Sequence, residues 1–417
     1  MPLVSRSSIV QPGPADRSRG LERQQAEAVG RPIAWLVRLL SFCGYTSGAG
    51  YGSLLIAVII WSACTFCSVY FIKTAIDNGT TTLLHGDLLT AVVGTGFFGV
   101  TALVPWLAVA AALLLSRRRY TALLGRLLRL TTDQRPLARR WRGGRETPAP
   151  SVLTAWLVVG LLPAGSMISH IVTHLPLDCC GTLTPASGNV FLQGLGFFAW
   201  FLLLYMLVVK FLLASQLLES CLETLHAGFA AASAQTGEDG VDADMRSMVQ
   251  LQEAVSEGLS ELTETMATEL TLTTLYGVLV LLELVLLLVD TVQRGARPAS
   301  IVSLLLYMSG AVVTLVVPCE QSERLLRALG GARDLLLRLE RHSWPRATQA
   351  GLLRRLVARD LATAGHLGLF RLRRATLLTI CTTIVTYIIV GAQFRLSGTG
   401  AGSNSDTLNV ENVTVTQ

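Results

Sequence analysis

The sequence predicts an all-α, polytopic membrane protein with seven transmembrane helices, its N-terminus inside and its C-terminus outside. Hydrophobic residues make up 51% of the 417 residues and charged residues only 15%, whereas about 25% of a soluble domain is charged. The apolar residues gather in blocks that are long enough to cross a bilayer, which takes about 20 residues per helix. Arginines gather in the loops on one side of these blocks, as the positive-inside rule describes.

The apolar blocks define the expected organisation of the chain. The predicted spans run over about 53–75, 88–115, 152–173, 190–213, 270–292, 301–317 and 375–394. Residues 1–50 are predicted to form a cytoplasmic tail, with an amphipathic helix at 31–44 along the inner membrane surface. The transmembrane domain is expected at 51–394 and a short extracellular tail at 395–417. The polar first thirty residues predict no cleavable signal peptide.

Arginine placement sets the expected orientation. The loop after the second span holds ten arginines between Arg117 and Arg145, and the loop before the last span holds twelve between Arg324 and Arg374. The long loops at 116–150, 214–269 and 318–373 are therefore assigned to the cytoplasm. The loop at 214–269 is acidic, but acidic residues weigh little in this rule. Two Asn-X-Thr sequons, at Asn78 and Asn412, fall on the opposite side and are predicted glycosylation sites.

The long loops carry their own helical signal. Residues 250–270 and 325–361 have apolar side chains at helical spacing. This pattern predicts amphipathic helices that continue the membrane helices below the bilayer and pack together. No segment outside the spans is large enough to be an independent enzyme, and no phosphate-binding glycine loop, HExxH or GxSxG motif is present. We expect neither enzyme activity nor a cofactor, and the position of the arginines argues against nucleic acid as a partner.

The strongest local motif lies in the last span. Thr386 and Tyr387 are followed by five apolar residues and then by Gln393 and Phe394. This matches the TY-five-apolar-QF signature that ends the insect and arthropod gustatory receptor family. The stretch 362–370 resembles the family's short Ala-Gly-Leu-Phe element, and Cys319-Glu320 after the sixth span also resembles the family pattern. The motif covers the last tenth of the chain, while the inferred topology agrees along its whole length.

The resemblance implies a ligand-gated, non-selective cation channel that detects tastants and assembles as a homo- or hetero-tetramer in the lipid bilayer. The last helix of each subunit would line a central pore, with Gln393 and Phe394 at the gate. Thr386 and Tyr387 would lie lower in the same helix, Tyr387 as a packing or coupling residue. The implied location is the plasma membrane of chemosensory dendrites. The small-molecule ligand, a sugar, a bitter compound or another nutrient, stays open, although Ile388 replaces the glutamate that usually follows the Thr-Tyr pair in sugar receptors.

In the family the ligand pocket lies within each subunit, in the outer half of the membrane. The aromatic and polar candidates in the matching spans of this chain are Phe97, Phe98, Ser166, Ser169, His170, Phe191, Gln193, Phe197, Phe198, Trp200, Glu283 and Tyr307. Glu283 is singular because a carboxylate inside a span is costly, so it should face protein or water or be protonated. It would either line the pocket or bond to a neighbouring helix.

Other patterns are weaker, and two other classes of protein remain as alternatives. His170 and His174 share a helical face but have no evident third metal ligand, so no metal site is predicted. Cys179 and Cys180 leave a disulfide open. A G-protein-coupled chemoreceptor would need an extracellular N-terminus. A secondary transporter would be expected to show inverted repeats, and the sequence has no detectable repeat.

Overall fold

The structure is a computed structural model that describes most of the predicted spans and of the long segments between them. The described residues are 29–46, 55, 58–66, 68–69, 73, 76, 99, 102–143, 153–174, 187–234, 241–293, 298–342, 347–363, 371 and 373–406. Their elements are α2 (Arg31–Phe42), a π-helical segment (Ala111–Ser116), α5 (Arg117–Asp133), α6 (Arg135–Trp141), α7 (Leu153–His174), α8 (Ser187–Ala234), α9 (Val241–Gln293), α10 (Pro298–His342), α11 (Ala347–Thr363) and α12 (Arg374–Asp406).

Every predicted span contains described residues, and those residues are helical. This confirms the prediction of an all-α, polytopic membrane protein. Three helices carry stretches that are long and apolar enough to cross a membrane, within Gly194–Ser233, Asp244–Leu288 and Ile301–Glu340. A shorter apolar stretch occupies Leu153–Ile168 in α7.

The three central helices are much longer than a bilayer requires. α8, α9 and α10 contain 48, 53 and 45 residues, whereas about 20 residues cross the hydrocarbon core. Each therefore continues well beyond its membrane span, as the helical spacing at 250–270 predicted. α9 runs through that region without interruption, whereas α10 contains Pro318 just after its apolar stretch.

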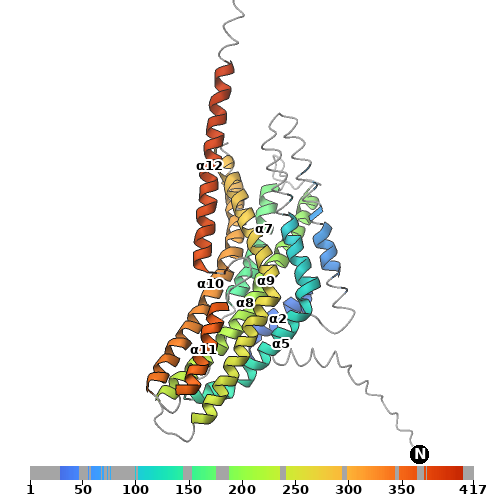
Figure 1. The fold of residues 1–417 in the computed structure, drawn as a ribbon. Helices are drawn as coiled ribbons and strands as arrows, with labels where there is room; N and C mark the ends of the chain where they lie inside the picture. The colour runs from blue at the N-terminus through green and yellow to red at the C-terminus, as the bar shows by residue number, and fades with distance from the viewer. Residues whose placement is uncertain are drawn as a thin grey trace, which may run out of the picture.

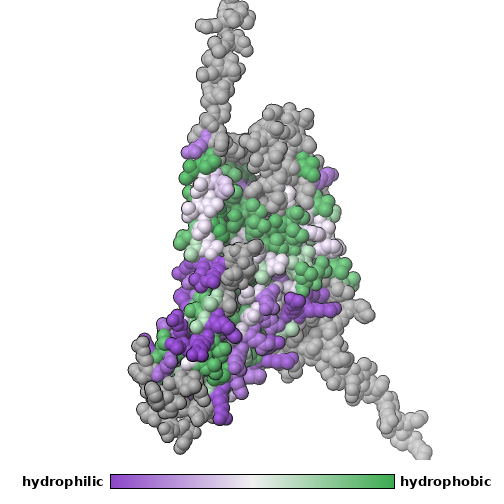
Figure 2. All heavy atoms as spheres, in the orientation of Figure 1, coloured by the Kyte–Doolittle hydropathy of each residue, from purple (hydrophilic) through white to green (hydrophobic). Residues whose placement is uncertain are grey.

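The distribution of hydropathy agrees with this division. Figure 2 shows hydrophobic side chains gathered over the upper part of the visible face and hydrophilic side chains over the lower part. The lower part corresponds to α5, α11 and the lower ends of α8, α9 and α10 in Figure 1. The bundle thus has an apolar half that suits a bilayer and a charged half that suits water.

Helix α8 forms the centre of the bundle. It packs against α2, α5, α6, α7, α9 and α10. Every side chain from Leu203 to Leu218 is buried, which is the pattern of a helix surrounded by protein on all sides. By contrast, Leu153, Leu157 and Leu161 on α7 are exposed at four-residue spacing, as expected for a face that meets lipid.

The amphipathic helix predicted before the first span is present as α2. Its apolar face, with Ile33, Leu36 and Leu40, is buried, while Trp35 and Phe42 are exposed. The predicted position of this helix on the membrane surface stays a prediction.

The last helix stands at the side of the bundle (Figure 1). α12 packs against α9 and α10 and continues beyond Phe394 to Asp406. The first part of the predicted C-terminal tail is therefore helical. The extracellular location of this part stays a prediction.

Candidate functional site

Helix α12 carries a polar stripe along one face. Thr379, Thr382, Thr383 and Thr386 follow one another at the three- and four-residue spacing that aligns side chains on a helix. Each hydroxyl donates to the carbonyl oxygen four residues earlier, at 2.9 to 3.1 Å. Gln393 lies seven residues after Thr386 and so extends the same face. The stripe therefore runs from the lower part of the helix to the predicted gate.

The stripe faces away from the rest of the chain. Ile384 is only 5% exposed, and its position two residues from both Thr382 and Thr386 places it off the stripe. The threonines of the stripe and Gln393 are exposed. The threonine stripe thus lies off the packed side, and the exposed surface of α12 also carries the apolar Leu378, Val385 and Ile389.

The predicted gate residues all lie on this helix. Thr386 belongs to the polar stripe, and Gln393 is exposed at its upper end. Tyr387 is 61% exposed within its own chain. Phe394 is helical, but its side chain lies outside the described part. Their assignment to a gate stays a prediction.

An ion-pair cluster ties the base of α12 to α10. Arg374 donates from Nε and Nη2 to Oε2 of Glu320, at 3.0 and 2.7 Å. Arg327 donates to Oε1 of the same carboxylate at 3.2 Å, and Arg324 lies 3.6 Å from it. The hydrogen bond from Arg374, helped by the charges of all three arginines, lowers the pKa of Glu320 from its ordinary value of 4.5. Cys319 and Glu320, which resembled the family pattern, thus lie where α10 meets the pore-helix candidate.

Replacing Glu320 with glutamine should weaken the attachment of α12 near neutral pH and have no such effect in acid. Because the folded-state pKa is lowered, the carboxylate stabilises the fold above about pH 4.5 and loses this effect as pH falls through the lower folded value. We expect a modest drop in the melting temperature of the purified protein at pH 7, since the groups are well exposed. The exposed Glu253→Gln is the control. A Glu320→Gln deficit that persists unchanged under strongly acidic conditions would contradict this reading.

An aromatic cluster joins α7, α8 and α10 within the apolar half. The ring of Phe201 lies 6.0 Å from Tyr205 and 5.8 Å from Tyr307. The Tyr307 hydroxyl donates to the carbonyl oxygen of Ser166 at 3.4 Å. Gly310 allows close approach, because a Cβ there would lie 2.0 Å from the Tyr205 hydroxyl oxygen. The cluster brings together two of the predicted pocket candidates, Ser166 and Tyr307.

Glu283 lies on α9 at the edge of the same region. It is half-buried, and Tyr276, two helical turns earlier on α9, is buried. Among the described residues, none is shown to form a hydrogen bond or ion pair with Glu283. Its place in a ligand pocket stays a prediction.

The remaining pocket candidates are only partly described. Trp200 is buried and Phe198 half-buried on α8. Ser169, His170, Phe191, Gln193 and Phe197 lie in described helices, but nothing is described of their side chains, while Phe97 and Phe98 lie outside the described residues. The sequon residues Asn78 and Asn412, and Cys179 and Cys180, also lie outside them. Within the described part, no three His, Cys, Asp or Glu side chains are grouped to hold a metal ion.

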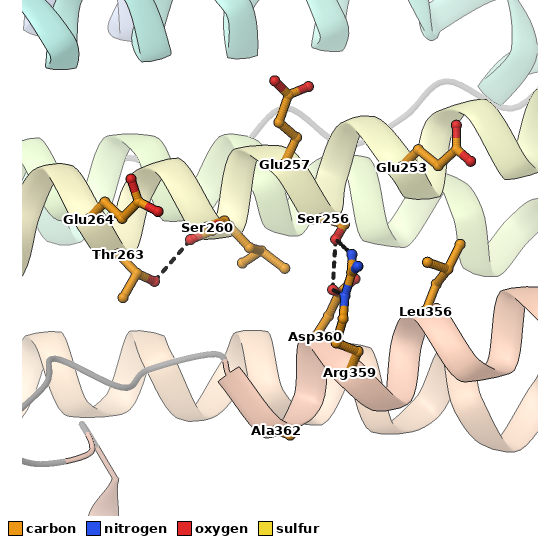
Figure 3. A pocket seen from close by; sticks show the side chains of 11 residues that line it. Glu253, Ser256, Glu257, Ser260, Thr263, Glu264, Leu356, Arg359, Asp360 and Ala362 are labelled. Carbon is orange, nitrogen blue, oxygen red and sulfur yellow. Dashed lines mark hydrogen bonds and ion pairs between the residues drawn. The ribbon is translucent and has the colours of Figure 1, made fainter.

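A cavity lies in the charged half of the bundle instead. It has a volume of about 880 Å³ and is lined by α9 and α11. Figure 3 shows Ser256 on α9 and Asp360 on α11 meeting at its wall. The buried Asp360 accepts hydrogen bonds from Ser256 at 2.7 Å and from Gln252 at 2.9 Å, and Arg359 donates to Ser256. These contacts hold α9 and α11 together, and the same residues form the wall of the cavity.

Comparison with known proteins gives one kind of match. No protein-family model matches the chain, and no curated protein matches it. Among solved structures it is similar to the insect olfactory receptor OR5 from Machilis hrabei, with a TM-score of 0.56 and 10% identity, over 91% of this chain and 97% of that one. A structure of the same receptor in complex with eugenol has a TM-score of 0.49 and 11% identity, over 91% and 99%. The chain therefore shares the fold of an insect olfactory receptor.

Proposed function

We propose that the chain is a chemoreceptor subunit that forms a ligand-gated, non-selective cation channel, of the gustatory type that the TY-QF motif indicates. The polar stripe of α12 carries this proposal. It is exposed on the chain's own bundle and ends in the exposed Gln393. Around a central axis, copies of this face would meet water and passing cations, which suit hydroxyl and amide groups better than lipid does. The shared fold with an insect olfactory receptor supports the proposal.

The gate follows from the chemistry of the motif. A ring of Phe394 side chains can close a narrow pore by excluding water, and a ring of Gln393 side chains offers dipoles to a hydrated cation. Below them, the threonine hydroxyls present oxygen atoms along the path. These groups carry no formal charge, which agrees with a pore that selects little among cations. Four copies, either identical or with related subunits, would surround the pore in the plasma membrane of chemosensory neurons.

The proposed pore is tested in cells that express the chain. A panel of tastants is applied to these cells, and the ligand-evoked currents are recorded. We expect Phe394→Ala to raise the current without ligand, because the apolar constriction is lost. Gln393→Ala should change the relative permeability to cations. The matched control is Cys381→Ala, since Cys381 is exposed on α12 but lies one residue from Thr382 and so off the stripe. Currents unchanged in both gate variants would remove α12 from the pore.

The topology separates this proposal from the G-protein-coupled alternative and needs no ligand. An epitope after Gln417 should be stained on intact cells, and Asn412→Gln should remove a glycan-dependent shift in mobility. Staining only after permeabilisation would refute the inferred orientation and favour the alternative receptor class. A transporter would instead be favoured if ligand uptake occurred without any channel current.

The ligand is proposed to bind in the apolar half near the aromatic cluster. Phe201, Tyr205 and Tyr307 provide ring faces, and Ser166, which accepts from Tyr307, is a polar residue beside them. Aromatic walls with a few polar groups suit a small amphipathic tastant. The tastant panel would identify the ligand. The class of ligand would then distinguish taste from internal nutrient sensing.

A further inference from the structure

A buried ion pair joins α8 and α9 outside the sites described above. Lys210 is 0% exposed and Glu269 is 1% exposed at the side chain. The Lys210 ammonium donates to both carboxylate oxygens of Glu269, at 2.9 and 2.8 Å. It also donates to the Ser116 hydroxyl oxygen at 3.2 Å. Both charges are thus removed from solvent and held by specific hydrogen bonds.

Two tyrosines enclose the ammonium. Its nitrogen lies 4.7 Å from the centre of the Tyr120 ring and 5.4 Å from that of the Tyr45 ring, within the range of a cation–π interaction. The Tyr120 hydroxyl donates to the carbonyl oxygen of Lys210 itself, and the Tyr45 hydroxyl donates to that of Leu203. The cluster therefore joins four parts of the chain: the residues after α2, the end of the second span with α5, α8 and α9.

The cluster ends at the π-helical segment, residues 111–116. Its last residue, Ser116, contacts the Glu269 carboxylate and also lies 3.3 Å from the carbonyl oxygen of Ala112 in its own helix. The single hydroxyl hydrogen can satisfy only one of these acceptors at a time. Ser116 is thus a link between the local geometry of the segment and a charge fixed on another helix.

A π-helical segment is a local alternative to the α-helix and often marks a functional position. Conversion of this segment to an α-helix would turn the preceding part of the span relative to α5 by about 100°, the angle of one residue in an α-helix. In the π-helical arrangement, Ala108 and Ala112 are buried, whereas Leu114 and Leu115 are exposed. Such a turn would move Ala108 and Ala112 toward the outer surface. An α-helical arrangement of the segment would therefore present a different outer surface from the π-helical one.

We propose that Lys210, Glu269 and Ser116 form a conformational lock that holds the second span in its π-helical arrangement. The ion pair is held in place between α8 and α9. The hydrogen bond of the Ser116 hydroxyl couples the second span to this pair. A buried ion pair gives little net stability compared with apolar residues of similar size, but it can specify one arrangement among several. The lock would open when Ser116 turns from Glu269 to Ala112.

The test is hydrogen–deuterium exchange of the full-length protein in lipid nanodiscs, comparing Ser116→Ala with Ser166→Ala. Ser166 is a matched control because it is also buried and donates to the carbonyl four residues earlier, at 3.0 Å, within α7. We expect amide exchange in residues 111–121 to rise about tenfold or more in Ser116→Ala, as loss of a hydrogen bond to a charged group implies. In Ser166→Ala it should stay at the wild-type rate.

Equal exchange in residues 111–121 for wild type, Ser116→Ala and Ser166→Ala would overturn the proposal. So would a Ser116→Ala protein in which exchange rises equally in every helix, because that result describes general destabilisation and not release of one segment. Neither readout needs a ligand or a current, so failure of the lock and failure of the proposed channel are distinguishable.

Discussion

Replacing Lys210 with methionine is expected to lower the free energy of unfolding by about 3–5 kcal/mol, the cost of leaving a buried partner charge without its counterion. Glu269 is 1% exposed and takes two of its hydrogen bonds from the Lys210 ammonium. Methionine keeps most of the side-chain volume but supplies no positive charge. The loss should be measured as reduced thermal stability of the purified protein in detergent, with retained expression as a precondition.

The double variant Lys210→Met, Glu269→Leu tests whether the unpaired Glu269 charge causes this loss of stability. With both charges removed, no buried ion remains, and we expect much of the stability to return. Lys73→Met provides the control, since Lys73 is an exposed lysine on the first span. A double variant that is less stable than Lys210→Met alone would show that the Glu269 carboxylate stabilises the fold through other contacts.

Replacing Gly310 with alanine is expected to destabilise the fold by about 1–3 kcal/mol, the usual effect of overpacking a filled core. A Cβ at this position would lie 2.0 Å from the Tyr205 hydroxyl oxygen, so the tyrosine has to move. Tyr205 stacks on Phe201 in the proposed ligand region, and a shifted ring should also change the ligand concentration that gives half-maximal current. Thermal unfolding and dose–response curves measure the two effects.

The control and the rescue for this variant lie in the same half of the bundle. Gly160 on α7 has no atom within 4 Å of an added Cβ, so Gly160→Ala should have little effect. Removing the clashing hydroxyl, in Gly310→Ala combined with Tyr205→Phe, should recover part of the loss. If Tyr205→Phe gives no recovery, another contact than this hydroxyl limits the space at Gly310.

The sequence was sufficient for the helical character of the predicted spans and for the long continuation of α9, because both depend on local periodicity. The apolar spacing at 250–270 predicted the lower half of α9, and the structure confirms one continuous helix there. The threonine spacing in α12 was equally visible, but its direction was not. Only the packing of Ile384 shows that the stripe faces away from the bundle.

The buried ion pair could not be predicted from periodicity, because it depends on contacts between distant segments. Lys210 stands at the end of an apolar run and Glu269 at the start of another, so each is typical of a residue that flanks a membrane span. Their meeting requires α8 and α9 to be aligned at one depth. The available signal was a lysine at the end of one span and a glutamate at the start of the next, since these two positions lie on the same side of a membrane.

The aromatic cluster was missed in part for a similar reason. Tyr307 and Ser166 were candidates, but Phe201 and Tyr205 were not, since aromatic residues inside apolar helices usually serve packing. Their convergence depends on the close approach of α8 and α10 at Gly310, and a single glycine in a span does not reveal its partner.

The uninterrupted length of α9 has a mechanical consequence. Its 53 residues extend roughly 80 Å at about 1.5 Å per residue, so a tilt of about 5° at one end displaces the other by roughly 7 Å. α10 lies beside it but contains Pro318, and proline is a common cause of helix kinks. Because α9 is continuous and α10 can bend at Pro318, a small movement in the outer half would make the two helices slide against each other. α12 packs against both helices, so this sliding would reach it.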